Sequence, residues 1–225
     1  MSIQGLVFDL DNTLYDADKA YVAALTRIGI SSDQLDASRQ RVKARLGRGH
    51  PSGRNRLLYL KCYLEAHKQF SPKKVITLMA AYEDALIHEV REQWRALKRD
   101  ALFEDLASRY QLAIVTNENT RTQLLKLLAI DPDGRFFPYV VTSEEVGIEK
   151  PNPRIFEEVL RLLLLPASRC AFIGDNYQTD IGPSHALGFR SFITYEFCQK
   201  SQNNPLRVRT LTALSHLPDA LRSQN

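Results

Sequence analysis

The sequence predicts an α/β fold in which helices cover both faces of a parallel sheet. Short apolar runs recur along the chain, each ends in polar residues, and stretches with helical periodicity separate them. One long stretch, residues 16–94, shows helical periodicity alone and no convincing strand. We therefore expect a core formed by residues 1–15 and 95–225 and an inserted helical domain formed by residues 16–94.

Three apolar runs are the strongest candidates for strands buried on both faces, because branched and aromatic side chains are frequent in them. They are Leu6 to Phe8, Leu112 to Val115 and Ala171 to Ile173. Two shorter runs, Val140-Val141 and Phe192-Ile193, are expected to add strands of the same kind. The carboxyl ends of parallel strands meet at one edge of a sheet, where α/β proteins bind ligands. The polar residues that follow these runs should therefore lie together.

Helices are expected between these strands and throughout the inserted stretch. In the core, the helical patterns span Ala101 to Tyr110, Thr120 to Leu128 and Arg154 to Leu164. In the inserted stretch, they span Lys19 to Ile28, Asp33 to Leu46, Arg56 to Lys68 and Pro72 to Val90. The segment from Gly47 to Gly53 is rich in turn-forming residues and is expected to be a loop.

The composition is that of an ordinary globular protein, with 225 residues, 44% hydrophobic and 25% charged. A net charge of +4 suits anionic small molecules and, without a concentrated basic patch, disfavours nucleic acid as a partner. No secretory signal is visible, and no apolar run approaches the ~20 residues of a membrane-spanning helix. We expect a cytoplasmic protein, a monomer or a homodimer, with no membrane partner.

Asp9 and Asp11 follow the first apolar run and are two residues apart. A strand places alternate residues on the same face, so both carboxylates can face one pocket at the strand end. Two ionised carboxylates this close repel each other unless a cation lies between them. A hard divalent ion with oxygen ligands, Mg²⁺ above all, meets that requirement. The alternative interpretation is a turn with solvated aspartates.

Three further clusters follow later in the chain. Asp175 and Asp180 form a second acidic pair directly after the third apolar run. Thr116 and Asn117 offer a hydroxyl, an amide and backbone donors that suit phosphate oxygens, although the same groups commonly cap helices. Lys150 lies in a proline-containing loop ahead of a helix. A lone lysine is usually part of a solvated surface, although rigid surroundings raise the odds of a defined role.

In this order, the four clusters resemble the motifs of the haloacid dehalogenase-like superfamily of hydrolases, in the subgroup whose helical cap follows the first motif. The resemblance runs from Leu6 to about Ile193. It implies a Rossmann-like core with an inserted cap, and a Mg²⁺ ion as cofactor. The implied metal ligands are the Asp9 carboxylate, the Asp11 backbone carbonyl and Asp175, with Asp180 in support.

The resemblance also implies catalytic roles. Asp9 attacks the phosphoryl group and becomes an aspartyl phosphate, while Asp11 protonates the leaving oxygen and then activates the hydrolytic water. Thr116, Asn117 and Lys150 bind the phosphoryl oxygens. Such a site suits phosphoryl transfer, which depends on positioning and on neutralising charge.

Three positions distinguish this chain within the superfamily. The founding dehalogenases lack an aspartate at the position of Asp11. A halide leaving group needs no proton whereas an alkoxide does, so Asp11 favours phosphoester chemistry. Many relatives have glycine where Asn12 stands, and asparagine tolerates the left-handed backbone that such a turn requires. Asn176 replaces a frequent serine and still donates and accepts hydrogen bonds.

Basic residues concentrate in the inserted stretch, from position 39 to position 61, with no acidic residue among them. A run of like charge is more often a solvated surface than a site, and this interpretation is preferred for Arg39, Arg41 and Lys43. The better candidates for contacting the non-phosphoryl part of a substrate lie in or beside the glycine-containing loop. They are Arg48, His50 and Arg54.

The sequence thus predicts a Mg²⁺-dependent phosphatase for a small phosphorylated metabolite, such as a sugar phosphate, a nucleotide or an organic acid phosphate. Two alternatives stay open. A phosphomutase uses the same nucleophile and a similar cap but protects the aspartyl phosphate from water. A non-catalytic protein could bind anions or nucleic acid through the basic stretch. The presence of Asp9, Asp11, Lys150 and Asp175 disfavours the non-catalytic alternative.

Overall fold

The structure, a computed structural model, describes residues 2–47, 50–197 and 206–222. Its sheet has six parallel strands in the order β3-β2-β1-β4-β5-β6. The strands are β1 (Gly5–Phe8), β2 (Gln111–Thr116), β3 (Tyr139–Thr142), β4 (Cys170–Gly174), β5 (Arg190–Thr194) and β6 (Arg209–Leu211). The predicted strands correspond to β1 through β5. The sequence did not predict β6, which has one apolar residue among its three.

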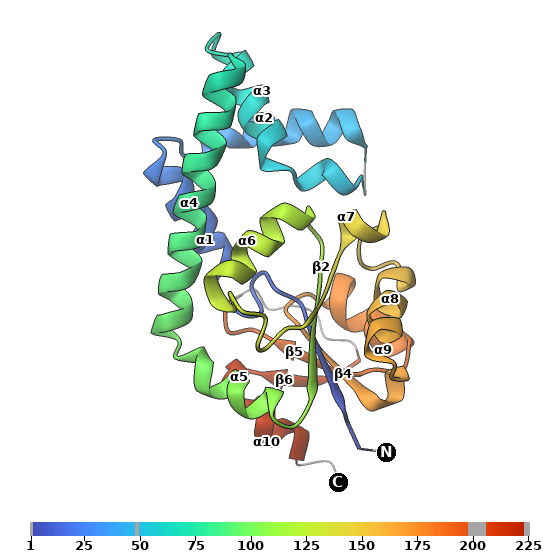
Figure 1. Ribbon diagram of the computed structural model, residues 1–225. Helices are drawn as coiled ribbons and strands as arrows, with labels where there is room; N and C mark the ends of the chain where they lie inside the picture. The colour runs from blue at the N-terminus through green and yellow to red at the C-terminus, as the bar shows by residue number, and fades with distance from the viewer. Residues whose placement is uncertain (1, 48–49, 198–205, 223–225) are drawn as a thin grey trace.

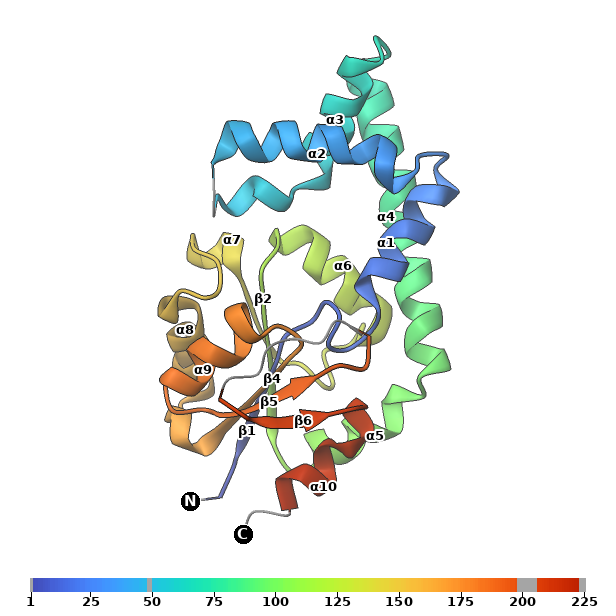
Figure 2. The same ribbon diagram turned by 180° about the vertical axis from the view of Figure 1, so that it is seen from behind.

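Helices cover both faces of this sheet, as predicted (Figures 1 and 2). The side chains of β1 alternate between two cores: Leu6 and Phe8 contribute to one, and Val7 contributes to the other. The first core includes residues of α5 (Arg99–Ala107) and α10 (Leu217–Arg222). The second core includes residues of α8 (Pro153–Leu163). The side chains of β1 are buried on both faces, which explains why its sequence is apolar throughout.

The remaining core elements are short or lie beside the strand ends. They are α6 (Thr120–Ile130), α7 (Ser143–Val146), the 3₁₀ turn η2 (Ala167–Arg169), the π-helical turn η3 (Tyr177–Ile181), α9 (Gly182–Ala186) and the 3₁₀ turn η4 (Leu214–His216). Among the described residues, no helix is long and apolar enough to cross a membrane.

Between β1 and α5 the described residues form helices joined by turns and loops, with no named strand, as predicted. This stretch contains α1 (Ala17–Arg27), α2 (Ser32–Leu46), the 3₁₀ turn η1 (Pro51–Arg54), α3 (Arg56–Ala66) and α4 (Pro72–Ala96). Its helices begin at side-chain caps, such as Ser31, which forms a capping box with Gln34 at the start of α2. Figure 1 shows α2 and α3 above the edge of the sheet where the strands end.

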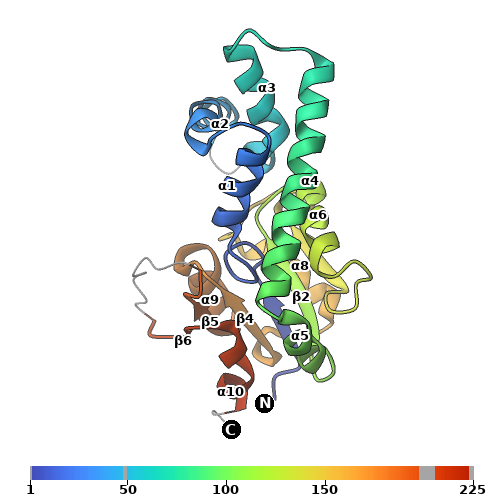
Figure 3. The same cartoon turned by 90° about the vertical axis from the view of Figure 1, so that its left-hand side faces the viewer.

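The longest helix, α4, connects this stretch to the core. It continues to Ala96, beyond the end expected at Val90, and runs down the side of the core beside α6 (Figure 3). Trp94 near its end is buried, stacks on Phe103 and donates a hydrogen bond to Asp100 at 2.9 Å. The helix continues because its last turns pack into the core. The expected boundary between residues 94 and 95 therefore falls within one continuous helix.

Candidate active site

The carboxyl ends of β1, β2 and β4 surround a pocket of about 180 Å³. The parallel register explains the arrangement, since Phe8 is level with Ile114 of β2 and Ile173 of β4, and Asp9 follows Phe8 directly. All four sequence clusters contribute to the pocket. The predicted residues that line it are Asp9, Asp11, Thr116, Asn117, Lys150, Asp175, Asp180 and Arg54.

Lys150 joins two of the carboxylates. Its Nζ atom lies 2.6 Å from Asp9 Oδ1 and 2.7 Å from Asp180 Oδ1, and it also donates to the Val115 carbonyl at 3.0 Å. All three charged side chains are buried. A lysine so placed can neutralise charge beside the Asp9 carboxylate, and therefore on any group bonded to it.

Asp175 completes a group of three carboxylates. Oxygen atoms of Asp9, Asp175 and Asp180 all lie within 4.8 Å of one another. Burial raises the pKa of Asp9 to about 7, against the opposing charge of Lys150, and Asp180 adds to the rise. Burial and the charge of Asp9 likewise raise the pKa of Asp175 to about 8. Three carboxylates with one lysine leave an excess of negative charge, and their oxygen ligands suit a hard cation such as Mg²⁺.

Two backbone features, at Gly174 and at Asn12, help to position the carboxylates of the pocket. A Cβ atom at Gly174 would lie 2.7 Å from Asp180 Cβ, so only glycine lets Asp180 pack against the end of β4. Asn12, in the turn after Asp11, has a φ of 60°, which confirms the left-handed geometry predicted for it. Its side-chain oxygen accepts a hydrogen bond from Ala17 N at 2.8 Å, and this contact connects the turn to the start of α1.

Asp11 has a different environment from Asp9, although it lines the same pocket. Both of its oxygens lie 2.8 Å from Nζ of Lys126, which is fully buried in α6. Tyr15 donates a hydrogen bond to the same carboxylate. Burial opposes ionisation of Asp11, but Lys126 outweighs it and lowers the pKa of Asp11 to about 2. In this structure Asp11 is therefore a carboxylate paired with its own lysine.

Thr116 and Asn117 use their side chains differently. Thr116 Oγ1 accepts a hydrogen bond from Gln123 Nε2 at 2.6 Å, so its own proton is free to point to another acceptor. The Asn117 side chain accepts from Lys150 N at 2.7 Å and donates to the Lys150 carbonyl at 3.0 Å. Its side-chain amide thus fixes the backbone of Lys150, while Asn117 also lines the pocket.

The fold and the arrangement of this pocket agree with a comparison against known protein families. Residues 3–188 match the haloacid dehalogenase-like hydrolase family. The chain belongs to this family. The match confirms what the order of the four clusters indicates, and it identifies the chain as a hydrolase.

Curated relatives of this hydrolase include phosphatases. The chain is 30% identical, over 83% of its length and 82% of the relative's, to a glyceraldehyde 3-phosphate phosphatase of Methanocaldococcus jannaschii. It is 34% identical, over 84% of its length and 83% of the relative's, to a ribulose-1,5-bisphosphate 5-phosphatase of Halopiger xanaduensis.

Solved structures share the fold at lower identity. A 2-haloacid dehalogenase of Pseudomonas syringae pv. Tomato has a TM-score of 0.75 at 23% identity, over 99% of this chain and all of that one (100%). A HAD phosphatase of Thermococcus onnurineus has a TM-score of 0.63 at 18% identity, over 97% of this chain and 98% of that one. At these identities the likeness shows the architecture that the hydrolase shares with both.

The helical stretch of the hydrolase reaches the pocket through Arg54 at the end of η1. The Arg54 side chain lies 3.3 Å from Glu149, next to Lys150. His50, the second predicted specificity residue, lines a neighbouring pocket together with Arg54. Arg48, the third, lies outside the described residues.

Sequence reasoning missed a second arginine at this junction. Arg56, at the start of α3, forms an ion pair with buried Glu118 in the loop after β2 and lies over the ring of Tyr21 at 4.4 Å. Its guanidinium also donates to the Arg54 carbonyl. Arg56 therefore connects α1, η1 and the core beside the active site. A signal was present in Arg54-Asn55-Arg56, where a helix cap stands between two arginines.

Proposed function

We propose that this hydrolase is a Mg²⁺-dependent phosphatase that acts on a small phosphorylated metabolite of the sugar phosphate class. The observation that carries the proposal is the contact of Asp9 with Lys150, within a group of three carboxylates at the ends of parallel strands. The relatives named as phosphatases of glyceraldehyde 3-phosphate and of ribulose-1,5-bisphosphate support the substrate class.

The proposed reaction has two steps. In the first, Asp9 attacks phosphorus, the bond between phosphorus and the ester oxygen breaks, and Asp11 gives its proton to the leaving alcohol. In the second, Asp11 takes a proton from water, the water oxygen attacks phosphorus, and free phosphate leaves Asp9. Lys150 and the Thr116 hydroxyl offset charge on the phosphoryl oxygens. The Asp9 carboxylate, the Asp11 carbonyl and Asp175 would hold Mg²⁺, with Asp180 in support, and the ion would neutralise further negative charge.

Asp11 must carry a proton to act as the acid in this scheme. Its pairing with Lys126 opposes protonation, because that pairing lowers the pKa of Asp11. The proposal therefore requires Asp11 to leave Lys126 when substrate binds. We also propose that residues 16–94 act as the cap that encloses the substrate, with Arg54 and His50 in contact with its non-phosphoryl part.

A panel of phosphorylated metabolites, assayed for phosphate release with Mg²⁺, tests the proposal. We expect turnover of one or more sugar phosphates, and we expect a chelator or the Asp9→Asn substitution to abolish it. Asp84→Asn is the matched control, because Asp84 is an exposed aspartate of α4, outside the pocket. Retained turnover in the Asp9→Asn protein would exclude Asp9 as the nucleophile.

The phosphomutase alternative is tested by the products formed from a bisphosphorylated sugar. A phosphatase releases inorganic phosphate, whereas a mutase returns an isomerised sugar phosphate. Within the same proposal, the protein is cytoplasmic and is a monomer or a homodimer. Cell fractionation and size-exclusion chromatography with light scattering test these two points.

A further inference from the structure

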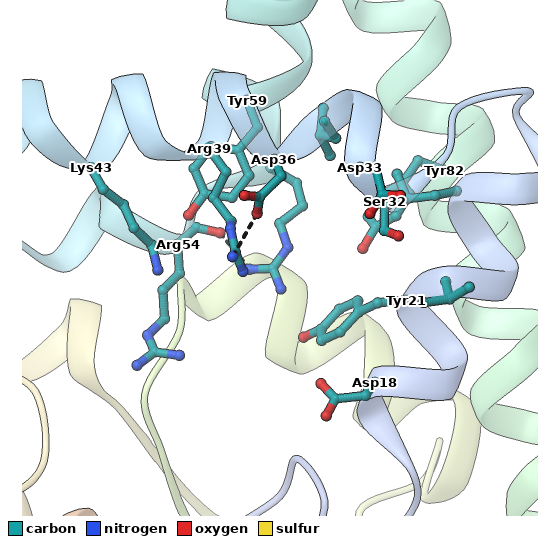
Figure 4. A pocket seen from close by; sticks show the side chains of 14 residues that line it. Asp18, Tyr21, Ser32, Asp33, Asp36, Arg39, Lys43, Arg54, Tyr59 and Tyr82 are labelled. Atoms are coloured by element: carbon teal, nitrogen blue, oxygen red, sulfur yellow. Dashed lines mark hydrogen bonds and ion pairs between the residues drawn. The ribbon is translucent and has the colours of Figure 1, made fainter.

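Two further pockets adjoin the active-site pocket at Arg54. The larger in volume, about 430 Å³, lies between α2, η1 and Glu149. The other, about 360 Å³, lies among α1, α2 and η1 (Figure 4). Arg54 lines both of them and also lines the active-site pocket. A substrate whose phosphoryl group lies at Asp9 therefore has room to extend past Arg54 toward α2.

Lys43 of α2 lines both of these pockets with Arg54. Figure 4 shows the two side chains pointing in the same direction, down from α2 and η1 toward the core. Each contributes a positive charge at the place where the pockets meet. A carboxylate or phosphate there would contact two cations from different elements, which is the arrangement that charge-assisted recognition uses.

The neighbouring arginines have partners of their own, whereas Lys43 has no ion pair among the described residues. Arg54 lies 3.3 Å from Glu149, which also lines the larger pocket. Arg39 lies 2.6 Å from Asp36, and Arg56 is paired with Glu118. Partial burial and the nearby charges of Arg39, Arg54 and Arg56 lower the pKa of Lys43, against a smaller opposing effect of Glu149. A cation crowded by other cations is stabilised by an incoming anion.

The opposite end of the smaller pocket has the opposite charge. Asp18 of α1 and Asp33 of α2 lie at that end, across the pocket from Arg54 and Lys43 (Figure 4). An anion is repelled there, whereas hydroxyl groups can donate hydrogen bonds to the two carboxylates. The pocket thus discriminates between its two ends, and the anionic part of a ligand belongs at the Lys43 end.

We propose that Lys43 and Arg54 form a second anion subsite, which binds a carboxylate or a second phosphate of the substrate while its first phosphoryl group lies at Asp9. The inference rests on the proposed phosphatase function and narrows its substrate class to phosphorylated molecules with a second anionic group. It also replaces the interpretation of Lys43 as part of a solvated surface.

Binding of matched ligands to the Asp9→Asn protein with Mg²⁺, followed by calorimetry, tests the subsite without turnover. Glycerol 3-phosphate and 3-phosphoglycerate differ in one end group, a hydroxymethyl or a carboxylate. Fructose 6-phosphate and fructose 1,6-bisphosphate make the same comparison for a second phosphate. We expect the more highly charged member of at least one pair to bind about tenfold more tightly, and the preferred pair identifies the anion.

Lys43→Met in the same background is expected to reduce the ratio of affinities within the preferred pair by about tenfold, so that its two members bind nearly equally. Arg41→Met is the matched control, because Arg41 is on the same helix, two residues away, and lines none of the three pockets. We expect it to keep the preference. Equal affinity within both pairs, or a preference that survives Lys43→Met, would overturn the subsite.

The proposed function fails separately from the subsite. The phosphatase proposal fails if the unsubstituted protein releases phosphate neither from any of these four compounds nor from p-nitrophenyl phosphate. The subsite fails if phosphate is released but the calorimetric preference is absent or independent of Lys43.

Discussion

Two aspartates of one loop, Asp9 and Asp11, contact two different buried lysines, and the two clusters differ in charge balance. Lys150 contacts Asp9 and Asp180, and Asp175 lies with them. Among the described residues, Asp11 is the one carboxylate that Lys126 contacts. The first cluster has three carboxylates for one lysine, and the second has one for one.

The pKa values follow this balance. Burial and neighbouring carboxylates raise the pKa of Asp9 to about 7, while Lys126 lowers that of Asp11 to about 2. The Asp9 cluster lacks positive charge, which a metal ion can supply. The Asp11 cluster is already neutral. Spacing alone therefore does not give both residues of an Asp-x-Asp pair the same electrostatic environment.

The largest expected effect is on turnover after loss of Lys150. Lys150→Met should lower kcat by about a thousandfold, because it removes the cation beside Asp9 and the phosphoryl oxygens. Lys126→Met should change kcat much less, because Lys126 contacts Asp11, which must leave it during turnover, and contacts neither Asp9 nor the phosphoryl oxygens. Steady-state kinetics at saturating Mg²⁺ make the measurement. A greater loss in the Lys126 variant would contradict the distinction between the two lysines.

The next largest effect is expected on Mg²⁺ affinity, which should depend on the Asp9 cluster and not on the Asp11 side chain. Asp175→Asn removes one carboxylate of the Asp9 cluster and should weaken Mg²⁺ binding at least about tenfold. Asp11→Asn keeps the backbone carbonyl and removes a charge already paired with Lys126, so Mg²⁺ affinity should stay within about twofold. Calorimetric titration with Mg²⁺ measures both, whether or not the variants turn over substrate. Equal weakening in the two variants would place the Asp11 side chain in the metal site.

The free energy of unfolding should depend more on the Asp11 cluster, in contrast to Mg²⁺ affinity. Lys126→Met leaves the Asp11 carboxylate unpaired in a largely buried place and should lower the free energy of unfolding by about 2 kcal/mol. Asp11→Asn added to Lys126→Met should recover part of the loss, because the unpaired charge is gone. Urea denaturation with a chelator present measures these changes. Lys73→Met, at an exposed position of α4, is the control and should change stability by less than about 0.5 kcal/mol.

Much of the Asp9 cluster could be predicted because its members follow strands. Apolar runs before Asp9, Thr116 and Asp175 identify strands, and parallel strands bring their carboxyl ends together. The Asp11 cluster could not be predicted in this way. In α6, Gln123 and Lys126 are buried while Leu124 and Leu128 are about half exposed, at 51% and 48%. These positions depart from the usual polarity because Gln123 and Lys126 contact the Asp11 carboxylate, although Leu127, Ala129 and Ile130 of the same helix are buried in the core.

The fold shows the same division between strong and weak sequence signals. Strands β1 to β5 and helices α1 to α4 have apolar periodicity or caps and were predicted, whereas η1 lies where the sequence predicted a loop. Leu211 is the one apolar residue of β6, so this strand has no apolar run that would reveal it. The end of α4 depends on the packing of Trp94 in the core. Neither signal is local. The proposed role of Lys43 was not predicted either, because it depends on Arg54, which lies on another element and lines the same pockets.

The smallest expected effect concerns the phenols around Asp11. Tyr15 is fully buried and donates to Asp11 Oδ1, whereas Tyr21 donates to Oδ2 at 3.3 Å and accepts a hydrogen bond from Lys126. Tyr15→Phe should lower the free energy of unfolding by about 1 kcal/mol, and Tyr21→Phe by less, because its contact with the carboxylate is longer. Urea denaturation measures both.

The same two substitutions in the Lys126→Met background test whether the phenols and Lys126 stabilise Asp11 independently. If Lys126 provides most of the charge that stabilises Asp11, the phenolic donors become more important once it is lost, and Tyr15→Phe should then cost more than about 1 kcal/mol. An unchanged cost would mean that Tyr15 and Lys126 act on Asp11 independently. A smaller cost would mean that the Asp11 cluster opens to water without its lysine, and the phenol then competes with solvent.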